Sequence, residues 1–402
     1  MRGFTRRATV EEALEWIDAH AAALDAESVP LTEAHGRVLA RRVISPIDVP
    51  GFDRSAMDGY AVRAAETVGA GDYNPLGFRI IGESLPGRPF TGAVAAGTAV
   101  RIMTGAPLPD GADAVVPAEY AAERAGHVEL TAAVSPGKHI GRTGEDIRAG
   151  GEILPALRTL RPQDVGVLAS VGLAEVAVIG RPRVRILITG NELVAPGQLL
   201  PPFQIYEANS SLLTGLVARD GGIIESLRHV EDDRAAIRAA MLAPGADVVL
   251  VSGGSSVGAE DHAPSILADV GELALHGLAM RPSSPAGMGR IGAVMVFLLP
   301  GNPVSCLCAY DFFAGRGIRR LGGWPAEWPY RPVTARLRRK IVSAIGRVDY
   351  CRVRLDGAEA EPLAVSGASI LTSTTRADGF VVVPAESEGH PAGATIRVYH
   401  YD

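Results

Sequence analysis

One short stretch of the chain, residues 247–262 with the sequence DVVLVSGGSSVGAEDH, constrains the fold most. Its first part, VVLV, is an apolar run typical of a strand buried on both faces. The glycines that follow let backbone N–H groups approach an oxyanion, and the serines beside them add hydroxyl donors. Asp261 then stands where a helix could begin. This order indicates a phosphate or oxyanion site at the carboxyl edge of a parallel sheet, although a tight turn with Asp261 as a plain N-cap is the alternative.

Apolar runs and helical spacings alternate around this stretch from residue 181 onward. We expect strands at 184–189, 223–227, 248–251, 272–276 and 293–299, and helices at 210–219, 234–242, 264–270 and 303–321. Alternation of this kind with short loops predicts a parallel, doubly wound α/β sheet.

Polar and glycine-rich segments follow each predicted strand, so they should meet at one edge of the sheet. They lie at residues 189–193, 231–233, 252–261, 281–285 and 300–305. Each alone also suits an ordinary turn or helix cap, but five on one edge predict a ligand site. Glu192, Asp232, Asp233 and Asp261 add carboxylates, which suit Mg²⁺ bridging to phosphate oxygens. The residues alone therefore indicate a nucleotide-like or phosphorylated ligand, with group transfer or hydrolysis at phosphorus.

The rest of the chain divides around this unit. A capping box, Thr9 with Glu12, opens a helix that should run to about residue 25, and Pro162 is well placed at the start of another that should stop near Gly172. Short strand patterns separated by turns predict a β-barrel or sandwich at 60–138 and a small β-barrel at 331–402. We expect four domains: an extended helical linker at 1–59 and 139–180, a β-rich insert at 60–138, the α/β domain at 181–325 and the barrel at 331–402.

Composition excludes several functional classes. The chain has 402 residues, a net charge of −6 and 5% aromatic residues, which argues against binding nucleic acid. Its three cysteines have neither zinc-ligand nor disulfide spacing, which favours a reducing compartment. There is no run of about 18 apolar residues and no apolar signal core. We therefore expect a cytoplasmic protein that does not span a membrane.

Six motifs in order carry a family resemblance: SAMDGYAV, RIMTGAPLP, GEDI, TGNEL, the SGG–SVG–ED stretch and LPGNPVS. Together they resemble molybdopterin molybdenumtransferase, the MoeA family, which is related to the gephyrin E domain. The resemblance covers nearly the whole chain. It implies an elongated, L-shaped homodimer of multidomain α/β plus β subunits, in which the α/β unit is the molybdopterin-binding domain.

The resemblance also implies a reaction and a set of site residues. Adenylylated molybdopterin and molybdate would react with the help of Mg²⁺; AMP leaves and molybdenum enters the dithiolene. The site would lie between subunits, and a molybdopterin adenylyltransferase is the expected upstream partner. The implied catalytic residues are Asp58, Thr104, Asp146, Glu192 and Asp261, and the implied metal ligands are Glu192, Asp232 or Asp233, and Asp261. The implied cofactor-binding residues are Ser252, Gly253, Gly254, Ser255, Arg281, Pro300, Gly301, Asn302, Pro303 and Ser373.

The chain departs from the family pattern at a few positions. Asn191 and Glu207 stand where aspartates are usual, and Phe203 replaces a glycine. In MRPSSP, the segment that usually resembles KPGKP, Arg281 keeps one positive charge and Ser284 removes the other. This segment motivates one alternative, a paralogue that inserts tungsten or acts at another molybdopterin step. A second alternative is a non-enzymatic scaffold or cofactor carrier.

Overall fold

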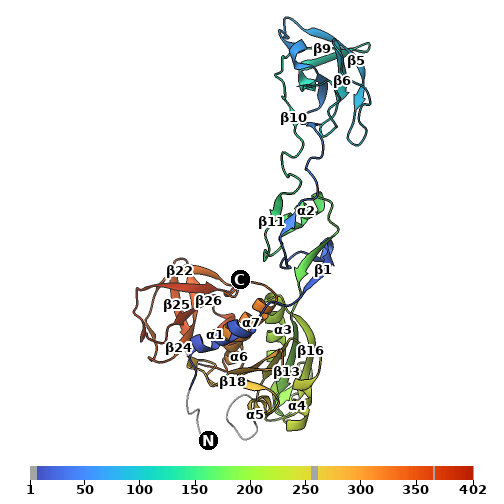
Figure 1. Ribbon diagram of the computed structural model, residues 1–402. Coiled ribbons are helices and arrows are strands. Elements are labelled where there is room, and N and C mark those ends of the chain that lie inside the picture. The colour runs from blue at the N-terminus through green and yellow to red at the C-terminus, as the bar shows by residue number, and fades with distance from the viewer. Residues whose placement is uncertain (1–6, 255–260, 365–366, 402) are drawn as a thin grey trace. The chain divides into compact units, whose positions relative to one another are not determined.

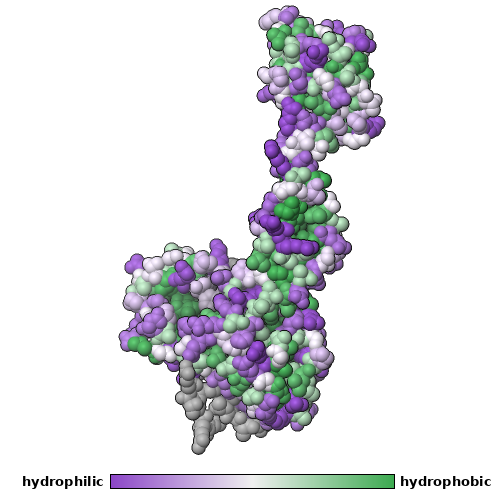
Figure 2. Space-filling view, in the orientation of Figure 1, coloured by the Kyte–Doolittle hydropathy of each residue, from purple (hydrophilic) through white to green (hydrophobic). Residues whose placement is uncertain are grey.

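The computed structural model describes residues 7–254, 261–364 and 367–401, which form two compact units (Figure 1). The first unit comprises Met1–Ser28, Gly36–Val38 and Ala177–Asp402, and the second comprises Val29–His35 and Leu39–Val176. No helix among the described residues is both long and apolar enough to cross a membrane. Hydrophilic and hydrophobic residues are interspersed over the face of the molecule that Figure 2 shows.

A six-stranded sheet forms the centre of the first unit, in the order β16-β13-β17-β21-β20-β18. Its strands are β13 (Arg183–Thr189), β16 (Ile223–Val230), β17 (Val248–Ser252), β18 (Glu272–His276), β20 (Gly287–Ile291) and β21 (Val294–Leu299). The strands β16, β13, β17 and β21 are parallel, as the alternation predicted. The sheet is nevertheless mixed, because the unpredicted strand β20 runs antiparallel to both β21 and β18.

Helices cover both faces of this sheet because its central strands alternate their buried side chains between two cores. Ile186, Leu250 and Phe297 face one core, and Leu187 and Val249 face the other. The first core is completed by α1 (Val10–His20), α3 (Asn209–Arg219), α6 (Pro303–Ala309) and α7 (Gly315–Leu321), the second by α4 (Arg234–Leu242) and α5 (His262–Val270).

Two predicted helices differ from those in the structure. The first ends at His20 rather than near residue 25, because the backbone of Ala21 leaves the helical conformation and Leu24 N–H pairs with the carbonyl of Leu321. The predicted helix at 303–321 is three segments: α6, a π-helical turn η4 (Tyr310–Ala314), and α7.

A closed five-strand barrel ends the first unit, since β26 pairs with both β28 and β24 in the order β24-β25-β22-β28-β26. Its strands are β22 (Arg331–Leu337), β24 (Val348–Asp356), β25 (Glu359–Ala364), β26 (Gly379–Val383) and β28 (Thr395–His400). β19 (Met280–Arg281) pairs with β24. Smaller elements of this unit are β14 (Leu193–Val194), β15 (Ile205–Tyr206), β23 (Ile341–Val342), β27 (Gly389–His390) and α8 (Thr372–Thr375).

The second unit is built on a six-stranded sheet in the order β7-β4-β6-β5-β9-β8, which packs one core around Tyr60 and Phe78 and another around Val100 and Ile102. Its strands are β4 (Gly59–Val62), β5 (Leu76–Ser84), β6 (Thr98–Ile102), β7 (Ala114–Pro117), β8 (Ala121–Arg124) and β9 (His127–Leu130). Its other elements are α2 (Pro162–Ser170), η1 (Leu31–Glu33), η2 (Ala64–Thr67), η3 (Ala118–Tyr120) and the strands β2 (Val43–Ile44), β3 (Arg54–Ser55), β10 (Ile140–Gly141) and β11 (Glu152–Leu154). The strands β1 (Ala26–Pro30) and β12 (Glu175–Ile179) each contain residues of both units. The helix predicted from Pro162 is present as α2.

Candidate functional site

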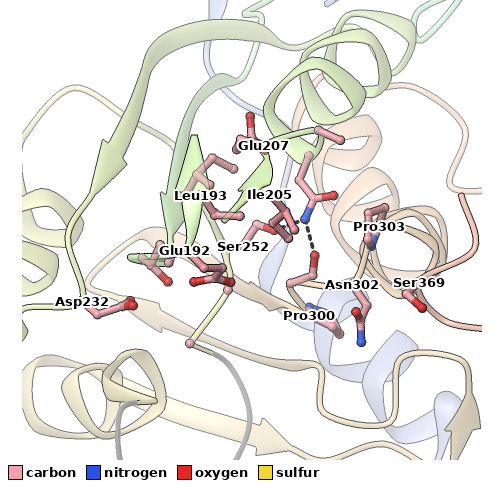
Figure 3. A pocket seen from close by; sticks show the side chains of 18 of the residues that line it. Glu192, Leu193, Ile205, Glu207, Asp232, Ser252, Pro300, Asn302, Pro303 and Ser369 are labelled. Carbon is pink, nitrogen blue, oxygen red and sulfur yellow. Dashed lines mark hydrogen bonds between the residues drawn. The ribbon is translucent and has the colours of Figure 1, made fainter. Parts of the chain in front are cut away.

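A pocket of about 600 Å³ opens in the first unit, where the parallel strands β13, β17 and β21 end (Figure 3). Four of the five segments predicted to meet at this edge supply most of its wall, and Pro285 comes from the fifth. The lining residues are Ile188, Thr189, Gly190, Glu192, Leu193, Ile205, Tyr206, Glu207, Ala208, Asn209, Asp232, Ser252, Gly253, Gly254, Asp261, Pro285, Pro300, Gly301, Asn302, Pro303 and Ser369.

Close backbone packing requires glycine at the floor of this pocket. Gly253 has a φ of 98°, and a Cβ atom there would lie 2.2 Å from the carbonyl oxygen of Thr189. A Cβ on Gly301 would lie 3.6 Å from the Cα of Gly253, so the turns that follow β17 and β21 run close together. The glycines therefore let the turns after β17 and β21 come together against one ligand space, where backbone groups can lie close to phosphate oxygens.

Three of the four predicted metal-binding carboxylates line the pocket: Glu192, Asp232 and Asp261. Figure 3 shows Glu192 and Asp232 on one side of it and Asn302, Pro303 and Ser369 on the other. Among residues 7–254, 261–364 and 367–401, no three His, Cys, Asp or Glu side chains are gathered closely enough to form a metal cluster on their own.

The structure separates the two neighbouring aspartates that the sequence left as alternatives. Asp232 accepts a hydrogen bond from the N–H of Asn191 at 3.0 Å and lines the pocket. Asp233 is instead the N-cap of α4, because its Oδ1 accepts a hydrogen bond from the N–H of Ala236 at 2.8 Å. Asp261 occupies the N-cap position of α5 but makes no capping hydrogen bond with its side chain.

A buried polar group at the back of the pocket was not predicted. Asn209, 6% exposed, donates hydrogen bonds to the hydroxyl of Ser252 and the carbonyl of Gly301. Ser252 lies 3.7 Å from the thiol of Cys306, whose pKa burial raises to about 12. That thiol stays protonated at neutral pH and is not a nucleophile. The only sequence signal for Asn209 was its place beside a predicted helix start, which also suits an ordinary cap.

A second cavity, of about 690 Å³, adjoins the first and shares Pro285, Pro300 and Asn302 with it. Its lining has a positive character because Arg7, Arg281 and Arg347 all contribute to it. The predicted cofactor ligand Arg281 lies here rather than in the first pocket.

A single buried carboxylate balances two of these arginines. Arg281 is ion-paired with Asp349, and the guanidinium of Arg347 lies 3.2 Å from the same carboxyl group. The hydroxyl of Ser284, also in the cavity wall, is buried without a hydrogen-bond partner among the described residues.

Two other residues were predicted as cofactor ligands. Ser373 lines neither cavity, and its hydroxyl donates to the carbonyl of Ile370; Ser369, four residues earlier, lines the first pocket instead. Ser255 lies outside the described residues.

The remaining predicted residues, Asp58, Thr104 and Asp146, belong to the second unit. The backbone N–H and the hydroxyl of Thr104 both donate to Oδ1 of Asp58 at 2.7 Å, which holds the pKa of that carboxyl below its usual value. Asp146 is exposed, and its backbone N–H donates to the carbonyl of Val49. The SAMDGYAV and RIMTGAPLP motifs are thus joined at one exposed, charged point.

The fold and the pocket define the class: a multidomain protein with a mixed α/β ligand-binding unit and a closed β-barrel. Three family models match consecutive parts of the chain. Residues 8–172 match the MoeA N-terminal region (domain I and II), 185–319 a probable molybdopterin binding domain, and 334–401 the MoeA C-terminal region (domain IV).

Relatives with known names or structures match over nearly their whole length. Molybdopterin molybdenumtransferase 2 of Mycobacterium tuberculosis is 36% identical over 92% of this chain and 94% of its own, and molybdopterin molybdenumtransferase of Haemophilus influenzae is 33% identical over 92% and 93%. The crystal structure of a molybdopterin biosynthesis moeA protein from Pyrococcus horikoshii OT3 covers 98% of this chain and 100% of that chain, with 31% identity and a TM-score of 0.81. The chain belongs to the MoeA family.

Proposed function

We propose that this chain inserts molybdenum from molybdate into adenylylated molybdopterin and releases AMP, as a step of molybdenum cofactor biosynthesis. The observation that carries the proposal is the first pocket, where two glycine turns and three carboxylates share one ligand space. The names of the relatives, molybdopterin molybdenumtransferase, support the same reaction.

The donors in this pocket fit a magnesium ion bound together with a phosphorylated ligand. Mg²⁺ commonly takes one or two carboxylates and completes its octahedron with water and phosphate oxygens, so it does not need a cluster of three protein ligands. One or two of Glu192, Asp232 and Asp261 would hold it. When bound, it would neutralise charge on the phosphoanhydride while AMP leaves.

The chain itself would position the phosphorylated substrate. Gly254 lines the pocket and is only partly buried, so its backbone would receive phosphate oxygens. The N–H of Gly253 is already used, because it donates to the carbonyl of Leu299 at 3.2 Å. The turn from Pro300 to Pro303 opens α6 and faces the same space. These groups are fixed by the packing of β13, β17 and β21, so they need little rearrangement when the substrate binds.

Molybdate is best placed in the second cavity. It is an anion, and the carboxylates of the first pocket would repel it. The second cavity offers Arg7, Arg281 and Arg347, with Asp349 beside the last two, and the buried hydroxyl of Ser284 supplies a hydrogen-bonding group. Because the two cavities share a wall, an oxyanion there would lie beside a pterin bound in the first pocket.

The proposed active form is a homodimer in which Asp58, Thr104 and Asp146 of one subunit complete the pocket of the partner subunit. The hydrogen-bonded pair of Asp58 and Thr104 supports this role, because it presents a fixed carboxylate at an exposed point of the second unit. A cytoplasmic location and supply of the substrate by a molybdopterin adenylyltransferase belong to the same proposal.

The test is AMP release from adenylylated molybdopterin by the purified chain. We expect release with Mg²⁺ and molybdate, and its loss when the metal is removed with EDTA and its return when Mg²⁺ is restored. A parallel reaction with tungstate addresses the paralogue suggested by Arg281 and Ser284. Preference for tungstate would identify a tungsten-inserting enzyme, and no AMP with either oxyanion would contradict the transferase proposal.

A further inference from the structure

Asn209, the first residue of α3, connects the two ligand-binding turns of the first pocket. Its Nδ2 donates to the hydroxyl of Ser252 at 2.9 Å and to the carbonyl of Gly301 at 2.7 Å, the hydrogen bonds drawn as dashed lines in Figure 3. Ser252 ends β17 and Gly301 follows β21. One side chain therefore holds together the turns after two neighbouring strands.

These hydrogen bonds fix which way the amide of Asn209 faces. The carbonyl of Gly301 can only accept, so the nitrogen of the amide must point toward it. Both N–H groups are then used, and Oδ1 is left to point elsewhere. Oδ1 is buried and has no hydrogen-bond partner among the described residues, although Asn209 lines the pocket.

A buried acceptor without a partner is destabilising, so its presence in a pocket wall points to a partner supplied by the bound molecule. A second buried oxygen supports the inference that the bound molecule supplies the missing partners. Thr189 also lines the pocket, and its Oγ1 has no hydrogen-bond partner among the described residues. The pocket thus has unused hydrogen-bonding capacity in addition to its glycine turns and carboxylates.

We propose that Asn209 is a specificity residue of this pocket, which accepts through Oδ1 a hydrogen bond from an N–H or O–H group of the substrate. An ionised phosphate offers only acceptors, so Oδ1 would select the nitrogen heterocycle or the sugar hydroxyls of the substrate and direct the phosphate away from α3. The inference rests on the proposed function and deepens it. The donor group belongs either to the pterin or to the nucleoside of the adenylylated substrate.

The experiment compares the affinities of the full-length protein for AMP and for molybdopterin, measured separately by calorimetry under anaerobic conditions. Asn209→Ala should weaken one of the two ligands by about 10- to 100-fold, the cost of an unpaired buried polar group, and leave the other nearly unchanged. The weakened ligand identifies which half of the substrate carries the donor. Ser211→Ala, at an exposed position of the same helix, is the matched control and should change neither affinity.

Asn209→Asp keeps an acceptor oxygen at the same place but loses both N–H donors, so it tests the inference even if Asn209→Ala does not fold. The ratio of the two affinities should then stay near that of the unaltered protein. Equal weakening of AMP and molybdopterin in Asn209→Ala, or no change in either affinity, would overturn the inference. A changed ratio of the two affinities in Asn209→Asp would overturn it as well. Failure of the unaltered protein to bind either ligand would overturn the proposed function, and this inference with it.

Discussion

Asp232 and Asp233 are adjacent in sequence, yet the structure gives them different environments. Asp232 faces the ligand pocket, whereas Asp233 satisfies a free backbone N–H at the start of α4. Sequence reasoning could not choose between them, because an aspartate just before a helix suits either role. Only the folded chain shows which of the two side chains lines the pocket.

This difference predicts opposite outcomes for two matched variants. Asp232→Ala should reduce AMP release by at least about tenfold, the loss expected when a metal site loses a supporting group, with the fold intact. Asp233→Ala should keep its activity but lower the free energy of unfolding by about 1 kcal/mol, because α4 loses its cap. Steady-state kinetics and urea unfolding measure the two effects. If Asp233→Ala alone lost activity, the assignment would be reversed.

At the scale of elements, the helix α2 provides a pH-dependent contribution to stability. Asp164 is buried at its start and accepts hydrogen bonds from the backbone N–H and guanidinium of Arg161 and from Arg158. The hydrogen bonds from Arg161 are the main cause that holds the pKa of Asp164 well below its usual value. Because the folded pKa is lower than the unfolded pKa, the stabilisation is complete above about pH 4 and is lost as the pH falls toward the folded pKa.

Hydrogen exchange of the amides of α2 tests this contribution. At pH 7, Asp164→Asn should lower the free energy of opening by about 1–2 kcal/mol, the value of hydrogen bonds to a charged group reduced by solvent around the exposed Arg161. The difference between the variant and the unaltered protein should shrink as the pH is lowered from about 4 toward 3. A difference that is constant with pH would show that the carboxylate charge contributes nothing.

The elements that sequence predicted best are those with a strong period and a clear boundary. Helix α4 was predicted at 234–242, the bounds it has in the structure, because its apolar residues repeat at helical spacing directly after Asp233. Strand β20 was missed because its sequence, GMGRI, contains no β-branched residue before its last position. Its Gly289 is explained only by tertiary contact, since a Cβ there would lie 1.8 Å from the carbonyl oxygen of Glu272.

Part of the candidate site could also be predicted from the sequence, and part could not. The convergence of loops at the carboxyl ends of β13, β17 and β21 follows from strand order, so Glu192, Ser252 and Asp261 could be assigned to one edge in advance. Asn209 and the placement of Arg281 in a separate cavity could not. Both depend on contacts between segments distant in sequence, and no local pattern records which side of a shared wall a residue will line.

At the scale of the whole molecule, the proposed homodimer predicts complementation between inactive variants. Asp58→Ala and Asp261→Ala should each abolish AMP release, because each removes one contribution to a site shared by two subunits. If the subunits are mixed and allowed to exchange, half of the dimers become mixed and each has one intact site, so about a quarter of the original activity should return. A mixture of Asp58→Ala with the double variant should stay inactive. Absence of recovery in a mixture shown to exchange subunits would place the site within one chain.

Following molybdenum together with AMP distinguishes transfer from hydrolysis. Release of AMP alone would also accompany simple hydrolysis of the phosphoanhydride, whereas transfer requires the metal to end on the pterin dithiolene. The purified protein is given adenylylated molybdopterin, Mg²⁺ and molybdate, and both AMP and pterin-bound molybdenum are measured over time. We predict that the two products form in equal amounts. Both should form more slowly with Asp232→Ala than with the unaltered protein. AMP without pterin-bound molybdenum would contradict the account, because the chain would then be a hydrolase and not a molybdenumtransferase.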